Sequence, residues 1–284
     1  MSSGFDDFSL ALFTTLAPAG TVAVIVLALT RVFAKSPETA VSLDRMIALP
    51  FSVCLVGFIA SATHLGTPAN ALHVFAGIGR SPLSNEVFSA VIFLFLVGSY
   101  WMMAFKRNFP NALARAWLVC SCVAGIAFLV CTSTAYAVHT VPTWDTWYTP
   151  ANLLLGGLMA GLLLGLLFLG FTASSSRISK IVLVASSGTA FAARCILLLG
   201  HFENISTLAN NETVATSLVP HYPAVIMIHI VLGAVAIFCA ACSLGKTRNT
   251  LTTHTLQALA VILSLAAVCL SRVVFYQLHL TLGF

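Results

Sequence analysis

The chain has 284 residues, of which 59% are hydrophobic and 7% are charged, and its formal net charge is +5. A soluble domain carries about 25% charged residues, so this composition excludes a water-soluble protein and makes the bilayer the solvent for most of the chain. The positive charge is spread out and forms no basic run, which gives no indication of nucleic-acid binding. We expect a single membrane-anchor domain over residues 1–284, without a soluble catalytic domain.

Eight segments have the length and apolar composition of membrane-spanning helices, which need about 20 mostly apolar residues. They cover residues 8–33, 45–64, 86–105, 113–136, 151–173, 180–201, 221–245 and 254–279. Runs of this length are too long and too continuous for the strands of a membrane barrel. The sequence therefore predicts an all-α integral membrane protein built as a bundle of eight transmembrane helices.

Basic residues gather in every second connection between these segments. The connections that carry them contain Arg31, Lys35, Arg45, Lys106, Arg107, Arg115, Arg177, Lys180, Lys246 and Arg248. The intervening connections contain one basic residue, Arg80. Because cytoplasmic loops of membrane proteins are enriched in Lys and Arg, we expect both termini outside, in the periplasm of a Gram-negative bacterium.

The eight cysteines all lie inside apolar segments, where a cysteine usually behaves as a small hydrophobic residue. Cys239 and Cys242 form a C-x-x-C pattern, but no second pair of ligands accompanies them in the sequence. We therefore expect no bound metal.

Ionisable side chains inside the bilayer are costly and usually functional or paired. With a rise of about 1.5 Å per residue, His64 lies roughly 28 Å along the second helix from Arg45, at its outer end. Glu86 begins the third helix, and Arg194 and Arg272 fall toward the outer ends of the sixth and eighth helices. The sequence therefore predicts a polar site near the outer face.

Three histidines, His201, His229 and His279, share this outer layer, whereas the inner half contains almost nothing comparable and His254 lies at most at its boundary. A continuous proton or ion path would need polar residues at several depths, and transporters often have polar residues at the midplane. This asymmetry argues against transport, which stays a less favoured alternative.

Quinol oxidation suits such a site, because it releases two protons and two electrons inside an apolar shell. A histidine can accept a hydrogen bond and a proton from a quinol hydroxyl, a carboxylate can pass the proton on, and an arginine can hold an oxygen in place. Each residue also has a structural explanation. His64 suits a helix C-terminus, Glu86 suits the first turn of a capped helix, and the arginines can pair or extend outward.

Four stretches of the sequence resemble the membrane-anchor subunit of the dimethyl sulfoxide reductase family. They read HLGTP at 64–68, SPLSNE at 81–86, TVPTW at 140–144 and RVVFYQLH at 272–279, and Thr149-Pro150 adds to them. The resemblance extends over the whole chain in the same order, with the same length and helix count. Asn70 departs from it, because other members carry an arginine there, so we assign no role to a basic residue at that position.

The resemblance implies a heterotrimer in the bacterial cytoplasmic membrane, in which a molybdopterin catalytic subunit and a four-cluster, ferredoxin-like iron–sulfur subunit dock on this anchor. It also implies that menaquinol binds the anchor, and the quinol-site histidine and glutamate of the family match His64 and Glu86. We therefore expect these two residues to act in quinol oxidation. The residues expected to bind menaquinol are His64, Gly66, Glu86, Arg194 and Arg272.

Haem-carrying anchors hold haem between histidines on facing helices, and this chain has no histidine pair at middle or inner depth. We therefore expect no haem, although a haem-b anchor of another respiratory oxidoreductase stays an alternative. Electrons do not cross about 30 Å of hydrocarbon quickly without a relay, so we expect the iron–sulfur subunit on the outer face near His64. The terminal electron acceptor binds elsewhere, so this sequence does not identify it.

Overall fold

The structure, a computed structural model, describes residues 4–63, 68–106, 109–172, 176–245 and 249–281, with the backbone alone over 4–7 and 68–71. Regular secondary structure in these ranges is helical, apart from an isolated bridge between Ala209 and Val214. Eight helical segments in the same ranges are long and apolar enough to cross a membrane. The predicted all-α class with eight spans is thus confirmed.

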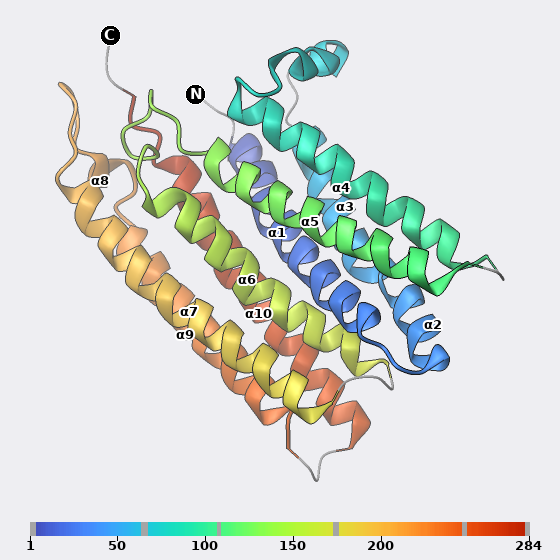
Figure 1. The fold of residues 1–284 in the computed structure, drawn as a ribbon. Helices are drawn as coiled ribbons and strands as arrows, with labels where there is room; N and C mark the ends of the chain where they lie inside the picture. Colours follow the sequence, from blue (N-terminus) through green and yellow to red (C-terminus); the bar gives the residue numbers. More distant parts are fainter. Residues whose placement is uncertain (1–3, 64–67, 107–108, 173–175, 246–248, 282–284) are drawn as a thin grey trace.

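The spanning segments form a bundle with two short additional helices at one end (Figure 1). The spans are α1 (Gly4–Val32), α2 (Pro37–Met46) continued by α3 (Ala48–Ala62), α4 (Pro82–Ala104), α5 (Asn111–Ala135), α6 (Tyr148–Gly170), α7 (Arg177–Ser206), α9 (Tyr222–Cys242) and α10 (Thr250–Gln277). The short helices are η1 (Pro68–Gly77) and α8 (Ala215–Leu218). Both lie in connections where hydropathy alone does not indicate a helix.

The second span is divided into α2 and α3 and begins at Pro37, eight residues before the predicted start at Arg45. Ser36 caps α2 by accepting a hydrogen bond from the Thr39 backbone N–H at 3.2 Å. Pro50 lies in the first turn of α3, where its ring and missing N–H disfavour an unbroken helix through the preceding turn. Because α2 contains many polar residues, a hydropathy criterion does not detect it.

Other helices also differ from their predicted bounds, and α4 and α7 are the two that change the position of an ionisable residue. α4 begins at Pro82, four residues before Glu86, and proline is favoured in the first turn of a helix. α7 continues to Ser206, five residues beyond the predicted end at His201. Glu86 and His201 therefore lie inside helices rather than at their ends.

α1 is the central helix of the bundle and packs against α3, α5, α6 and α10. α4 pairs with α5, α6 with α7, and α9 with α10. The contact between α1 and α6 joins the first half of the chain to the second, and both helices are largely buried. Side chains on α1 consequently meet residues from both halves of the molecule.

Glycines on α6 allow α1 to approach closely. A Cβ added at Gly161 would lie 2.5 Å from the Ala19 carbonyl oxygen and 2.5 Å from Val22 Cβ, which no side chain tolerates. Gly157 and Gly165, one turn away on either side, face α1 in the same way. Small residues at four-residue spacing are typical of tightly packed membrane helices.

The described ends of the chain lie at the same end of the bundle as η1 and α8 (Figure 1). The C-terminal ends of α1, α4, α6 and α9 lie at the opposite end. The orientation of these two ends relative to the membrane stays a prediction from the basic residues.

Candidate functional site

Of the five residues expected to bind menaquinol, the structure describes the side chains of three. Glu86 on α4, Arg194 on α7 and Arg272 on α10 are buried, with exposed fractions of 3%, 1% and 2%. His64 and Gly66 lie outside the described residues, so their roles stay predictions. The three described residues lie toward the end of the bundle that carries η1, as their depths in the sequence predict.

Arg272 is held by partners from three helical segments. Its Nε donates to Thr14 Oγ1 at 3.0 Å, its Nη2 donates to the Tyr276 hydroxyl at 3.0 Å, and that hydroxyl donates to Thr14 Oγ1 at 3.2 Å. The guanidinium carbon also lies 4.2 Å from the Phe275 ring centroid and 5.4 Å from that of Tyr136. Cation–π contacts and hydrogen bonds partly replace the water that this charge loses on burial.

Glu86 brings a buried acid to the same cluster. Its carboxyl group lies near the Thr132 hydroxyl on α5 and interacts electrostatically with Arg272. Neither Glu86 Oε1 nor Thr132 Oγ1, however, has a partner with hydrogen-bonding geometry among the described residues. A buried oxygen without a partner is costly, so Glu86 Oε1 is suited to accept a hydrogen bond from a bound molecule.

Arg194 is a second buried cation, close enough to Arg272 for their charges to repel. Its Nη2 donates to Ser271 Oγ at 2.7 Å, whereas Nε and Nη1 have no partner in the described part of the chain. The nearby Asn152 Oδ1 is also without a partner there. Arg194, Asn152 and Arg272 line a cavity of about 10 Å³. This volume is enough for about one water molecule.

The buried histidines of this layer have protein partners. His201 Nε2 lies 3.3 Å from the Thr143 carbonyl oxygen, and its Nδ1 lies 3.0 Å from the Tyr222 hydroxyl. Because a carbonyl only accepts, Nε2 carries the proton and Nδ1 of the neutral ring accepts from Tyr222. His229 Nδ1 lies 2.9 Å from the Ala267 carbonyl oxygen, but its Nε2 has no partner among the described residues.

The connection before α6 covers the end of α10 beside this cluster. Trp144 Nε1 donates to the Phe275 carbonyl oxygen at 2.9 Å, and the two rings stack with centroids 5.2 Å apart. Thr143 Oγ1 donates to the Leu278 carbonyl oxygen at 2.5 Å, and the His279 ring lies 5.0 Å from the Trp144 ring. His279 therefore packs against the Trp144 ring.

A second buried polar cluster lies at the opposite end of the bundle, and it corrects the expectation that this half has almost none. Arg31 Nε donates to Asp44 Oδ1 at 2.8 Å, and Arg31 Nη1 donates to Asn111 Oδ1 at 3.0 Å. The Tyr100 hydroxyl donates to the same Asp44 oxygen at 2.5 Å. These charged groups are paired with one another, whereas Glu86 and Arg194 keep polar atoms that have no partner in the described ranges.

Sequence reasoning identified Glu86, Arg194 and Arg272 but missed the residues that hold them. Thr14, Thr132 and Tyr136 belong to spans in which hydroxyl groups are common and carry no signal of their own. Tyr276 lies inside the motif at 272–279, so its position next to Arg272 in the sequence was an available signal. The link from Thr14 to Arg272 joins residues 258 positions apart and is visible only in the fold.

Comparison with known proteins assigns the sequence to a family. The family described as DMSO reductase anchor subunit (DmsC) matches residues 1–278. One relative belongs to the anaerobic dimethyl sulfoxide reductase of Escherichia coli and is 32% identical over 287 residues, which cover 100% of this chain and 98% of that protein. Another E. coli relative, the anaerobic dimethyl sulfoxide reductase protein YnfH, is 30% identical over 289 residues, with the same coverage.

A further relative belongs to the anaerobic dimethyl sulfoxide reductase of Haemophilus influenzae and is 27% identical over 285 residues, again with 100% of this chain and 98% of the relative covered. These matches agree with the eight spanning helices and with a multi-pass protein of the bacterial inner membrane. The resemblance found in the motifs is thereby confirmed, and the chain belongs to the family of DMSO reductase membrane-anchor subunits.

Proposed function

We propose that this anchor subunit oxidises menaquinol at the Glu86–Arg272 cluster and passes the electrons to an iron–sulfur subunit of a DMSO-reductase-type molybdoenzyme. The observation that carries the proposal is the buried Glu86 carboxyl group. Its Oε1 has no hydrogen-bond partner among the described residues, although the carboxyl group interacts electrostatically with Arg272. A quinol hydroxyl is a donor of the kind that this oxygen lacks.

In this proposal Glu86 accepts a proton and Arg272 stabilises negative charge. Oxidation of the quinol releases two protons and two electrons, so the site needs a group that accepts a proton. Glu86 Oε1 accepts the hydrogen bond and then the proton, while Arg272 stabilises negative charge in surroundings of low dielectric constant. Thr14 and Tyr276 fix the guanidinium in advance, which limits the reorganisation that accompanies charge movement.

Arg194 supports the site electrostatically. The cavity that it faces holds about one water and is far too small for the ring system of a naphthoquinol. Arg194 and Arg272 are both buried cations whose charges repel each other, and the positive charge of Arg272 favours loss of a proton from the quinol hydroxyl. We therefore keep Arg194 in the site as a residue that acts through Arg272 and Ser271.

The proposal also places the iron–sulfur subunit on the end of the bundle that carries η1. Glu86 lies within two turns of that end, whereas the opposite end is separated from it by the length of α4. An electron released near Glu86 has a short path to a cluster docked at the near end and no described relay to the far end. We propose that the complex binds menaquinol without haem, so its visible spectrum would lack haem bands.

The test is the replacement Glu86→Gln in the assembled complex. Glutamine keeps the shape of the side chain but is a poor proton acceptor, so the rate of menaquinol-analogue oxidation should fall about 100-fold or more. The rate with an artificial electron donor to the reductase should stay unchanged. Glu203→Gln, at an exposed acid near the same end on α7, is the matched control. Normal quinol oxidation in Glu86→Gln would refute the proposal.

A further inference from the structure

A basic hollow lies at the end of the bundle opposite the Glu86–Arg272 cluster. It has a volume of about 320 Å³ and is enclosed by the C-terminal parts of α1 and α4, the N-terminal part of α5 and helix α2. Its charged lining residues are Arg31, Lys35, Asp44, Lys106 and Arg115. Four cations and one anion give these residues a formal charge of +3.

The cations of the hollow are only partly neutralised by the protein. Arg31 is paired with Asp44 through a hydrogen bond of 2.8 Å between Nε and Oδ1. Arg115 Nη2 donates to the Ala34 carbonyl oxygen at 3.3 Å, which keeps its charge at the mouth of the hollow. In the described part of the chain, the side chains of Lys35 and Lys106 have neither a hydrogen-bonding nor an ionic partner. An anion bound between them would relieve the repulsion.

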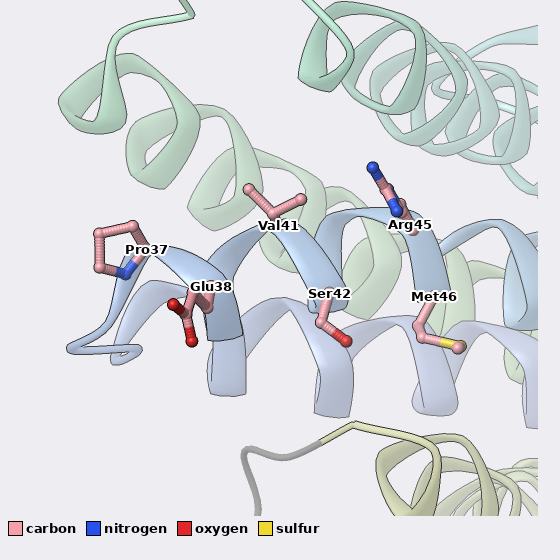
Figure 2. A pocket seen from close by; sticks show the side chains of 6 residues that line it. All are labelled: Pro37, Glu38, Val41, Ser42, Arg45 and Met46. Atoms are coloured by element: carbon pink, nitrogen blue, oxygen red, sulfur yellow. The ribbon is translucent and has the colours of Figure 1, made fainter.

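The hollow continues into apolar surface beside α2. A second hollow of about 370 Å³ shares Val41, Asp44 and Lys106 with the first and is also lined by Phe105. Val41 on α2 and Phe105, which follows α4 directly, are 51% and 58% exposed. A depression of about 550 Å³ lies on the surface of α2 (Figure 2). It is lined by Pro37, Glu38, Val41, Ser42, Arg45 and Met46.

Figure 2 shows how the α2 side chains divide this surface. Val41 and Arg45 point to one side of the helix, and Glu38, Ser42 and Met46 point to the other. Val41 and Arg45 also line the second hollow, beside Lys106. A basic and an apolar side chain therefore reach into the same space from successive turns of α2.

We propose that this hollow binds the head group of an anionic phospholipid, with the phosphate between Lys35, Lys106 and Arg115 and an acyl chain along Val41 and Phe105. The hollow lies at the ends of spanning helices, where head groups are found, and it combines cations with exposed apolar side chains. Basic pockets between transmembrane helices suit lipid phosphates. The bound lipid would bridge α1, α2, α4 and α5. The proposal does not depend on the proposed function.

The test uses the purified full-length protein in a neutral detergent, with native mass spectrometry as the readout. Phosphatidylglycerol should remain bound under conditions that remove phosphatidylcholine. The triple variant Lys35→Gln, Lys106→Gln, Arg115→Gln should retain phosphatidylglycerol at least about tenfold more weakly, since each basic residue near a membrane surface changes lipid binding about fivefold. The double variant Lys35→Arg, Lys106→Arg keeps the charges and should retain the lipid.

The matched control is Arg177→Gln, Lys180→Gln, which removes two cations from the same end of the bundle on α7. This variant should bind phosphatidylglycerol like the unmodified protein. The unfolding midpoint in detergent without lipid should be the same for all variants, and phosphatidylglycerol should raise it for the unmodified protein but not for the triple variant. Equal retention of both lipids, equal loss in the control, or the same stabilisation by inorganic phosphate alone would overturn the proposal.

Discussion

Single side chains in this protein are fixed by partners that lie far away in the sequence. Arg272 depends on Thr14 at the other end of the chain, and Arg31 depends on Asp44 and Asn111. Burial of a charge costs several kcal/mol unless hydrogen bonds and counter-charges offset the loss of water. The paired cluster around Arg31 meets this condition within the protein, whereas Glu86 and Arg194 meet it only in part.

His64 provides a residue-scale prediction that is separate from Glu86. Alanine at this position removes the imidazole that the family resemblance assigns to the quinol. We expect a selective loss of menaquinol-dependent electron transfer, with the rate from an artificial donor and the assembly of the complex both retained. His73→Ala, at an exposed position of η1, is the comparison. Unchanged quinol turnover in His64→Ala would leave His64 with a capping role.

His139 provides a pH-dependent prediction. Its Nδ1 lies 2.8 Å from Asp145 Oδ2 in the exposed connection before α6. This hydrogen bond, and secondly the negative charge of Asp145, raise the pKa of His139 above its ordinary value near 6.5. Because the pKa is raised in the folded protein, the contact contributes to folding stability below pH 6.5. This contribution is lost as the pH rises through the raised pKa.

Diethyl pyrocarbonate reacts with neutral imidazole, so its rate at His139 measures this titration. The midpoint for His139 should lie above pH 6.5 in the unmodified protein, and Asp145→Asn should move it down. A midpoint that is the same in both proteins would show that Asp145 does not influence His139.

At the scale of helices, close packing between α1 and α6 connects the two halves of the molecule. Gly161→Ala should weaken this contact, because the new Cβ would lie 2.5 Å from both the Ala19 carbonyl oxygen and Val22 Cβ. We expect a loss of about 1–3 kcal/mol in unfolding free energy. Gly188→Ala on α7 is the control, since its nearest neighbour is Ile237 Cγ2 at 3.7 Å. Denaturation in detergent would compare them, and equal stability of the two variants would contradict the expected clash.

Hydropathy sufficed to predict the spanning helices because the cost of an exposed peptide group in lipid is local and falls on every residue of a span. It did not predict the break at Ile47, which depends on Pro50 and on the polar face of α2. It also missed η1 and α8, since helices of 10 and 4 residues are much shorter than the stretch of about 20 residues that the criterion detects. The number and type of the spanning segments were therefore predictable, whereas their bounds and the additional short helices were not.

The candidate site was also predictable only in part. Depth along the helices predicted that Glu86 and Arg272 lie in one layer, because residue spacing fixes the rise along a helix. It could not predict that Thr14 and Tyr136 enclose Arg272, since their lateral placement is set by packing. The cluster of Arg31, Asp44 and Tyr100 was missed because charged residues at helix ends are normally solvated, and only the fold pairs them.

At the scale of the whole molecule, the distribution of basic residues predicts the orientation in the membrane. A fusion of alkaline phosphatase after Phe284 should be active, because this enzyme folds outside the cytoplasm. The same fusion after Lys180, at the end that carries the basic connections, should be inactive. The reverse pattern of activities would place both termini in the cytoplasm and would invert the docking side proposed for the iron–sulfur subunit.

The central position of α1 has a consequence for biosynthesis. Val32 ends α1 and Gly170 ends α6, so the ribosome adds 138 residues between them, which takes about 7–28 s at 5–20 residues per second. During this interval α1 lacks the contact with α6 that it has in the folded protein. Thr14, Thr15 and Thr21 each donate a hydrogen bond to a carbonyl oxygen one turn earlier in α1. These threonine hydroxyls are therefore hydrogen-bonded within α1 itself, so they need no partner from the second half of the molecule while it is being made.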